Sequence, residues 1–386
     1  MNKDAFVSGQ KTLAILGGGQ LGKMLLQCAQ TWDINTKVLD PAADAPAQHL
    51  THSFTQGALL DYDTVCAFAK DADVITIEIE HVNTEALAFL ESQGKTVHPK
   101  PAALRIIQDK GLQRNFYAEQ QLPSPNYSLF DNAQAVAAAI TAGTLSYPFV
   151  QKSRKAGYDG KGVVLVRSEK DLAQLLDTDC VCEDLVDLAT EISIIAVRNA
   201  KDEVVCYDPV QMDVHSDANL LDELVFPASV DSTIAKKAKE LAAQIIRAFD
   251  ICGLLAVEFF VSKDGQLLIN EVAPRPHNSG HQTIESCITS QYENHIRGIL
   301  NFPLGSTKII QPSVMINVLG EPGFSGPVVY EGLEACLAEE GIKVHIYGKK
   351  ETRPMRKMGH ITIIAPTVEA AKQKAKWVKQ TLKVKA

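Results

Sequence analysis

Residues 256–273 constrain the fold most, because two runs of apolar residues are joined there by a short polar turn. Asp264-Gly265 in that turn is a strong signal for a two-residue β-hairpin loop. Counting outward from the loop pairs Ser262 with Leu267 and sets every later pair of the hairpin. The segment therefore predicts two antiparallel strands in a fixed register.

That register places two glutamates, Glu258 and Glu271, directly opposite each other. Opposed side chains have Cβ atoms roughly 4.5–5.5 Å apart, and like charges there are destabilising. An unpaired carboxylate in an apolar strand costs still more, so we expect a positive group between the two. Two carboxylates that leave room for water and phosphate oxygens suit Mg²⁺, with Mn²⁺ as its substitute. The alternative is a hairpin near the surface whose glutamates point into solvent.

The chain has 386 residues, enough for two or three domains of ~100–200 residues each. Its net charge of −8 argues against general binding to nucleic acid or anionic membranes, although it allows a local basic site for a small anion. It has no apolar leader and no apolar run of about 18 residues, so we expect a cytoplasmic protein. The eight cysteines include no Cys-x-x-Cys pair, which favours free thiols over a zinc site or disulfides.

The first part of the chain alternates short strands with helices. Strands at 12–16, 37–40 and 74–79 and a helix at 23–30 predict a parallel, doubly wound sheet. The first strand is followed by a turn of the pattern Gly-x-Gly-x-x-Gly, which opens the helix. The backbone amides of such a turn can cradle an anion. Its residues are Gly17, Gly19 and Gly22, with Gln20 between them and Asp40 at the end of the next strand. A dinucleotide site, a site for another ligand and a purely structural turn all stay open.

The middle of the chain mixes hairpins and helices. Strands at 147–152 and 162–166 flank a loop with three glycines, which is not a Walker A loop. We expect a flap over a phosphate chain, with Lys152 fixed at a strand end and Lys161 carried by the flap; the alternative is a solvated basic tip. Further expected elements are helices at 102–121, 231–250 and 368–382, a hairpin of 190–198 with 203–207, and a strand at 360–365.

Three polar segments complete the candidate sites. Residues 182–186 could offer backbone groups to an adenine edge, although a plain connecting loop is the commoner reading. Residues 273–281 follow Glu271 and gather the donors Arg275, His277, Asn278, Ser279 and His281. Residues 347–360 form a basic island that could bind an anion or simply face solvent; its cations are Lys349, Lys350, Arg353, Arg356 and Lys357.

Together these motifs resemble the ATP-grasp superfamily and, within it, the N5-carboxyaminoimidazole ribonucleotide synthetase family. The resemblance rests on residues 17–22, Lys152 with 157–162, 255–260, 270–281 and 347–360, which occur in the family's order. It implies an α/β and α+β fold of three domains: a Rossmann-like domain over 1–108, an ATP-grasp domain over 109–302 and a small C-terminal α+β domain over 303–386.

The resemblance also implies the roles of individual residues. Glu258 and Glu271 match the metal ligands, and Asn270 is assigned to the nucleotide because strict alternation puts it on the opposite strand face. The nucleotide-contacting positions are Lys110, Lys152, Gly157, Tyr158, Asp159, Gly160, Lys161, Gly162, Val163, Glu183, Asp184, Leu185, Val186, Glu191, His215, Asn270 and Glu271. The positions near the acceptor and the carboxylating group are Gly19, Gln20, Leu21, Glu80, Tyr158, Asp159, Arg275, His281, Lys349 and Arg356.

The activity implied is carboxylation of 5-aminoimidazole ribonucleotide with ATP and bicarbonate, through carboxyphosphate, in purine synthesis by a homodimer. A sister ligase such as formate-dependent glycinamide ribonucleotide transformylase would share the same phosphoryl chemistry. An NAD-dependent dehydrogenase or a non-catalytic nucleotide-binding module is the alternative from another class. Lys110 stands where the family commonly has Arg, Ala156 replaces a usual glycine, and residues 76–81 depart from the family's more aromatic pattern.

Overall fold

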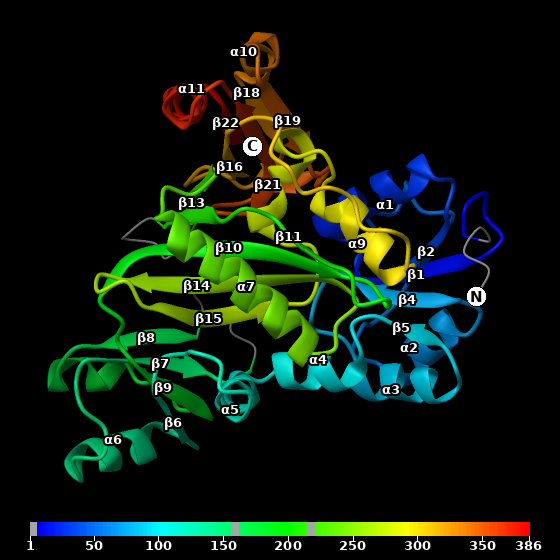
Figure 1. Ribbon diagram of the computed structural model, residues 1–386. Helices are drawn as coiled ribbons and strands as arrows, with labels where there is room; N and C mark the ends of the chain where they lie inside the picture. Colours follow the sequence, from blue (N-terminus) through cyan, green and yellow to red (C-terminus); the bar gives the residue numbers. More distant parts are fainter. Residues whose placement is uncertain (1–5, 156–161, 215–220) are drawn as a thin grey trace.

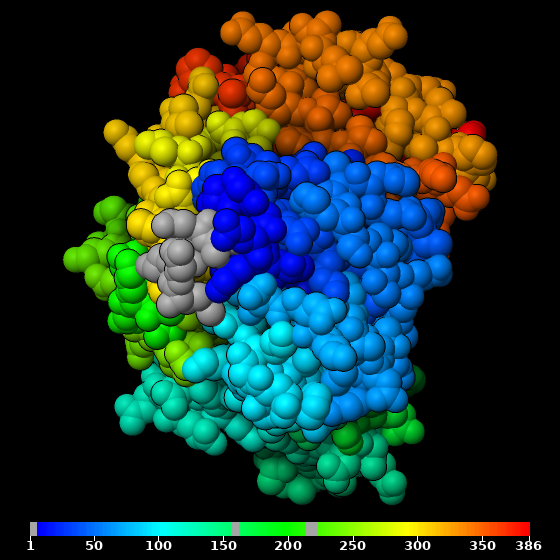
Figure 2. Space-filling model, turned by 90° about the vertical axis from the view of Figure 1, so that its right-hand side faces the viewer, coloured from blue at the N-terminus to red at the C-terminus, as the bar shows by residue number. Residues whose placement is uncertain are grey.

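The computed structural model of the chain describes residues 6–155, 162–214 and 221–386. A long antiparallel sheet runs through the middle, with the first domain beside it and the C-terminal residues at one end (Figure 1). Seen from the side, the first domain packs against both the middle of the chain and the C-terminal part (Figure 2). Among the described residues, none of the helices combines the length and the apolar character that a bilayer crossing requires.

The first domain is a five-stranded parallel sheet in the order β3-β2-β1-β4-β5. Its central strands are apolar and buried because helices cover both faces, so the predicted doubly wound sheet is confirmed. Helix α1 packs on one face, and α2 and α3 pack on the other. The elements are β1 (Thr12–Leu16), α1 (Gln20–Thr31), β2 (Asn35–Asp40), β3 (Ser53–Gln56), α2 (Tyr62–Ala69), β4 (Val74–Ile77), α3 (Thr84–Ser92) and β5 (Thr96–Val97).

A smaller, four-stranded antiparallel sheet in the order β6-β9-β7-β8 follows the connecting helices α4 and α5. The predicted single helix over 102–121 is wrong: it divides because Asp109 caps α5, accepting hydrogen bonds from the amides of Gly111 and Leu112. The elements are α4 (Pro101–Ile107), α5 (Lys110–Glu119), β6 (Tyr127–Phe130), α6 (Ala133–Thr141), β7 (Phe149–Ser153), β8 (Val163–Val166), the 3₁₀ helix η2 (Glu169–Gln174) and β9 (Cys180–Asp184).

The large sheet has the order β15-β14-β10-β12-β13-β16-β21-β19, with β11 also paired to β10. Both faces of β10 are buried: Ile192 and Ile194 pack beneath α7, while Ile195 packs in the core of the opposite face. The elements up to the predicted boundary at residue 302 are β10 (Leu188–Arg198), β11 (Val204–Cys206), β12 (Val210–Val214), β13 (Leu221–Phe226), α7 (Ser232–Ala248), β14 (Gly253–Ser262), β15 (Leu267–Ala273), the 3₁₀ helix η3 (Asn278–Gly280), α8 (Thr283–Ser286) and α9 (Gln291–Ile299).

The C-terminal segment continues this sheet rather than forming a separate one, because β16 pairs with β13. Helix α11 packs against one face of this part of the sheet, in a core that includes Val314, Ile361 and Val378. The elements are β16 (Ser313–Leu319), β17 (Gly326–Pro327), β18 (Val329–Glu331), α10 (Leu333–Ala338), β19 (Ile342–Ile346), β20 (Glu351–Thr352), β21 (Lys357–Ile364), α11 (Val368–Thr381) and β22 (Lys383–Lys385).

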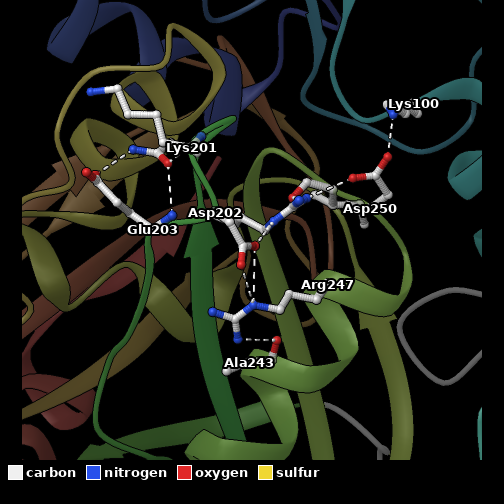
Figure 3. A network of polar contacts seen from close by, with 10 residues as sticks. Lys100, Lys201, Asp202, Glu203, Ala243, Arg247 and Asp250 are labelled. Atoms are coloured by element: carbon white, nitrogen blue, oxygen red, sulfur yellow. Dashed lines mark hydrogen bonds and ion pairs between the residues drawn. The ribbon is translucent and has the colours of Figure 1, made fainter.

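Two polar connections join the first domain to the large sheet. On α9, His295 accepts a hydrogen bond from the Leu254 amide at 3.1 Å, and its other ring nitrogen lies 3.1 Å from the hydroxyl of Thr76 in β4. The second connection is an ion-pair network at the end of β10 (Figure 3). Its members are Lys100, Arg198, Asp202, Arg247 and Asp250.

Candidate active site

The predicted hairpin forms and pairs Glu258 with Glu271, but its loop and its register differ from the prediction. Its loop has three residues, because Val261, not Ser262, lies opposite Leu267 and Gly265 adopts the left-handed φ of +82°. The predicted two-residue loop is therefore wrong by one position. A bulge at Asn270 then adds one residue to β15 and restores the register, so Glu258 does lie opposite Glu271.

The bulge also changes where Asn270 points. Its Oδ1 accepts a hydrogen bond at 3.0 Å from Nζ of Lys152, and that same lysine acts electrostatically on Glu271. Side chains do not alternate strictly at a bulge, so the prediction that alternation turns Asn270 away from Glu271 was wrong. Its contact with a nucleotide stays a prediction.

The two glutamates differ in their electrostatics. Burial and repulsion from Glu271 and Glu191 raise the pKa of Glu258 well above its ordinary value. For Glu271, burial is outweighed by Lys110, whose Nζ lies 3.4 Å from Oε2, and by Lys152, so its pKa is lowered. The pair therefore favours a state with one negative charge, and a second charge would need a further cation.

The residues at this pair fit a hard divalent cation, because two carboxylates converge and the two lysines do not neutralise Glu258. Within the described part of the chain, no group of three or more His, Cys, Asp or Glu residues forms a metal site. The two glutamates would therefore supply only part of the coordination. The remaining ligands would be oxygens of water or of a bound phosphate.

Glu183 forms a buried ion-pair cluster with two cations that also contact Asn270 of the hairpin. Its carboxylate accepts hydrogen bonds from Arg114 at 2.7 Å and from Lys152 at 2.9 Å. These two cations outweigh burial and lower the pKa of Glu183. Arg114 also donates to the carbonyl of Asn270 at 2.8 Å, so the cluster fixes Lys152 against the hairpin.

The other nucleotide positions are brought together only in part. Glu191 lies near the pair, where burial and Glu271 raise its pKa against the opposing effect of Lys152. Asp184, at the end of β9, accepts a hydrogen bond from Asn126, and Leu185 beside it is exposed. Val163 begins β8 opposite Lys152, and the carbonyl of Gly162, just before the strand, accepts a hydrogen bond from the amide of Ser153. Val186 is half-buried in the connection between β9 and β10. Six further predicted residues lie outside the described residues, as does Ala156: Gly157, Tyr158, Asp159, Gly160, Lys161 and His215.

Three segments far apart in the sequence carry the residues that are predicted to lie near the acceptor. Arg275 of the loop after β15 pairs with Glu80, which follows β4 of the first domain, at 2.8 Å. Lys349 of the basic island donates to the carbonyl of Lys357 at 2.8 Å. Burial and repulsion from Arg356 lower the pKa of Lys349 to about 8. Arg356 itself donates to the carbonyl of Glu351 at 2.6 Å.

His281 and His277 have different surroundings. His281 is fully buried, its Nδ1 lies 2.9 Å from the Tyr292 hydroxyl, and its ring is 4.6 Å from that of His360. His277 lies 3.6 Å from Glu258, so the structure places this residue, and not His281, at the carboxylate pair. The sequence pattern indicates His277 only as one donor among several, although it is two positions from Arg275, so its place beside Glu258 was not predicted.

The glycine turn of the first domain is already filled by the protein's own carboxylates. Gly19 and Gly22 donate their amide hydrogens to Glu78 at 2.9 and 2.7 Å, and Gly18 donates to Asp40 at 2.7 Å. The anion that these amides cradle in the structure is thus supplied by Glu78 and Asp40, and contact of Gly19 with a ligand stays a prediction. The dinucleotide alternative loses the free amides on which it rested.

Comparison with known families assigns all three parts of the chain. Residues 10–108 match the ribonucleotide synthetase preATP-grasp domain, 115–292 the ATP-grasp domain, and 313–374 the phosphoribosylaminoimidazole carboxylase C-terminal domain. With the carboxylate hairpin and its lysines, these matches define an ATP-grasp protein.

Individual relatives narrow this class. The N5-carboxyaminoimidazole ribonucleotide synthase of Brucella melitensis is 37% identical over 372 residues, which is 95% of this chain and 99% of that one. The structure of N5-carboxyaminoimidazole ribonucleotide synthetase from Thermotoga maritima has a TM-score of 0.89 and 39% identity, over 97% of this chain and 99% of that one. An Aspergillus clavatus N5-carboxyaminoimidazole synthase, in complex with ADP and 5-aminoimidazole ribonucleotide, has a TM-score of 0.88 and 32% identity, over 97% and 98%.

The chain belongs to the N5-carboxyaminoimidazole ribonucleotide synthase family, as the resemblance predicted. It spans 66% of the length of the phosphoribosylaminoimidazole carboxylase of Candida albicans that it also matches.

Proposed function

We propose that this protein carboxylates 5-aminoimidazole ribonucleotide, using ATP and bicarbonate, in purine biosynthesis. The observation that carries the proposal is the carboxylate pair Glu258–Glu271 facing Lys110 and Lys152, beside a second cluster around Arg275. The ADP and acceptor of the Aspergillus clavatus relative support the assignment of both ligands.

The chemistry requires two transfers. An oxygen of bicarbonate attacks the γ-phosphorus of ATP, and ADP leaves with the electrons of the broken bond. The amine of the acceptor then attacks the carboxyl carbon of carboxyphosphate, phosphate leaves, and the amine loses a proton. Phosphoryl transfer depends mainly on positioning and charge neutralisation, so the protein need not form a covalent bond.

The chain's own residues divide this work between two places. Lys152, held by Glu183 and Asn270, would contact phosphate oxygens from a fixed position. Glu258 and Glu271 would hold Mg²⁺ or Mn²⁺, which neutralises phosphate charge when bound. Arg275, Lys349 and Arg356 would hold the acceptor and the anionic intermediate. Tyr158, Asp159 and Lys161, which lie outside the described residues, are assigned by the resemblance to the same site. Water must be excluded from that site, because carboxyphosphate hydrolyses readily.

We also propose the division into domains at 1–108, 109–302 and 303–386, a homodimer, and a cytoplasmic location. The family matches support the domain division, since they begin and end near these limits. The homodimer follows from the family resemblance alone. Sedimentation of the purified protein would test it, and a monomer at micromolar concentration would contradict it.

The test is ADP release by the wild-type protein with four combinations of substrates. Bicarbonate or formate is combined with 5-aminoimidazole ribonucleotide or glycinamide ribonucleotide, each with ATP and Mg²⁺. We expect full release only with bicarbonate and the aminoimidazole nucleotide. Release that requires formate and glycinamide ribonucleotide would establish the sister ligase instead, and none in any combination would favour a non-catalytic module.

A further inference from the structure

We propose that Glu78 is a positioning residue, whose carboxylate takes the place of a ligand anion in the glycine turn and holds Gln20 and Leu21 towards the acceptor. The inference rests on the proposed function, because it concerns the acceptor side of the same site. Glu78 does not touch the acceptor in this role and acts through the backbone of the turn.

The hydrogen bonds of Glu78 are those that a bound anion would make. Its side chain is buried, with 8% of the residue exposed. One oxygen accepts the amide hydrogen of Gly19 at 2.9 Å, and the other accepts that of Gly22 at 2.7 Å. Because α1 begins at Gln20 and Gly19 has no side chain to cap it, Glu78 supplies the missing cap from the segment that follows β4.

The glycines of the turn are explained by this carboxylate. A Cβ added to Gly17 would lie 2.5 Å from Cγ of Glu78, and one added to Gly19 would lie 2.8 Å from its Oε1. Gly17 also has a φ of +99°, which side chains rarely adopt. The glycine pattern, which reads in sequence as a phosphate cradle, therefore accommodates an internal carboxylate.

The position of Glu78 connects the turn to the acceptor residues. Glu78 and Glu80 both follow β4, and Glu80 pairs with Arg275 at 2.8 Å. The charge of Arg275 opposes the rise that burial causes in the pKa of Glu78. The charge of Glu78 opposes the fall that burial causes in the pKa of Lys349, so both cations lie close to the turn. The turn, the loop after β15 and the basic island therefore lie near one another. A shift of the turn would move Gln20 and Leu21, which the resemblance assigns to the acceptor.

The same arrangement has a consequence for specificity. A nucleotide phosphate cannot use the amides of Gly19 and Gly22 while Glu78 accepts from both. Glu78 would therefore direct nucleotide binding to the middle of the chain and leave the first domain to the acceptor.

The test is the variant Glu78→Ala, with Asp73→Ala as the matched control. Asp73 also accepts a backbone amide hydrogen, from Thr12 at 3.0 Å, but at the far end of β4. We expect Glu78→Ala to raise KM for 5-aminoimidazole ribonucleotide about tenfold, with KM for ATP within about twofold of wild type. Added acetate should fill the vacated cradle and restore KM, whereas Asp73→Ala should leave KM unchanged and respond to no acetate.

Two outcomes would overturn the proposal: an unchanged KM for the acceptor in Glu78→Ala, or a rise that acetate does not reverse. If Glu78→Ala fails to fold, Glu78→Gln serves, because it keeps the shape and one acceptor oxygen; an acceptor KM equal to wild type in that variant would then overturn the inference. Should the wild type not use this acceptor, the proposed function fails separately. Thermal unfolding still tests the cradle, since acetate should then raise Tm for Glu78→Ala and not for wild type.

Discussion

The glycine turn and the glutamate hairpin are both built around carboxylates, yet the turn satisfies its carboxylate with backbone amides, whereas the hairpin sets two carboxylates opposite each other. In the turn, each oxygen of Glu78 receives a backbone amide, so the protein satisfies its own anion cradle. Burial raises the pKa of both Glu78 and Glu258, but in the hairpin Glu258 also faces Glu271, whose repulsion raises its pKa further. The comparison teaches that a ligand site is better recognised by charges that the fold leaves uncompensated than by a familiar motif.

The proposed metal role of the hairpin is tested by the variant Glu271→Gln. This change removes the charge that Lys110 and Lys152 stabilise, with little change in shape. We expect bicarbonate-dependent ADP release to fall at least about a hundredfold, because charge neutralisation at the phosphates is lost. Glu293→Gln, which only breaks a pair with Arg297 on α9, is the control and should keep turnover. Wild-type turnover in Glu271→Gln, measured by a coupled ADP assay, would remove the metal role of the hairpin.

The lysine side of the hairpin is tested by Lys152→Met. The change leaves Glu183 with Arg114 as its remaining cation and removes the proposed phosphate contact. We expect KM for ATP to rise roughly tenfold or more, and the free energy of unfolding to fall by about 1–3 kcal/mol. Lys263→Met, which removes an exposed pair with Asp187, should alter neither. Urea unfolding and initial rates measure the two effects, and an unaltered KM for ATP would contradict the role of Lys152.

The proposed role of Lys349 in binding the acceptor can be tested through the pH dependence of KM. Burial and Arg356 lower the pKa of Lys349 to about 8, so this lysine loses its charge as the pH rises through that value. We expect KM for 5-aminoimidazole ribonucleotide to rise several-fold between about pH 7 and pH 9, because a charged donor to the anionic acceptor is lost. Lys349→Arg keeps its charge over this range and should flatten the profile. An identical rise in that variant would assign the pH dependence to another group.

The smallest effect is expected where the polar groups satisfy one another at the surface. Arg247 pairs with Asp202 at 3.1 Å in the network of Figure 3, and both side chains are about half exposed. Arg247→Ala should lower the free energy of unfolding by less than about 1 kcal/mol and leave ADP release unchanged. Denaturant unfolding checks this, and altered turnover would show that the network influences the active site.

Local patterns were enough to predict much of the fold. The strand at 12–16, the parallel sheet and the pairing of Glu258 with Glu271 follow from periodicity and turn signals. The glutamate pairing was right although the loop was wrong, because the three-residue loop and the bulge at Asn270 shift the register in opposite directions. Neither feature has a clear sequence signal, since Asp264-Gly265 suits both kinds of loop.

Contacts between distant segments could not be predicted in this way. Glu78 lies 59 residues from Gly19, and nothing in the local sequence shows that its side chain enters the turn. The same is true of Glu183, which pairs with Arg114 across 69 positions. His277 and His281 share one loop, and only the tertiary packing places the first at Glu258 and the second against Tyr292.

An experimental structure with Mg²⁺ and a non-hydrolysable ATP analogue would show whether the nucleotide binds at the glutamate hairpin or at the glycine turn. We expect the cation between Glu258 and Glu271, the phosphates beside Lys152, and the glycine turn still bonded to Glu78. A nucleotide phosphate on the amides of Gly19 and Gly22, with no ion near either glutamate of the hairpin, would contradict the assignment of the active site.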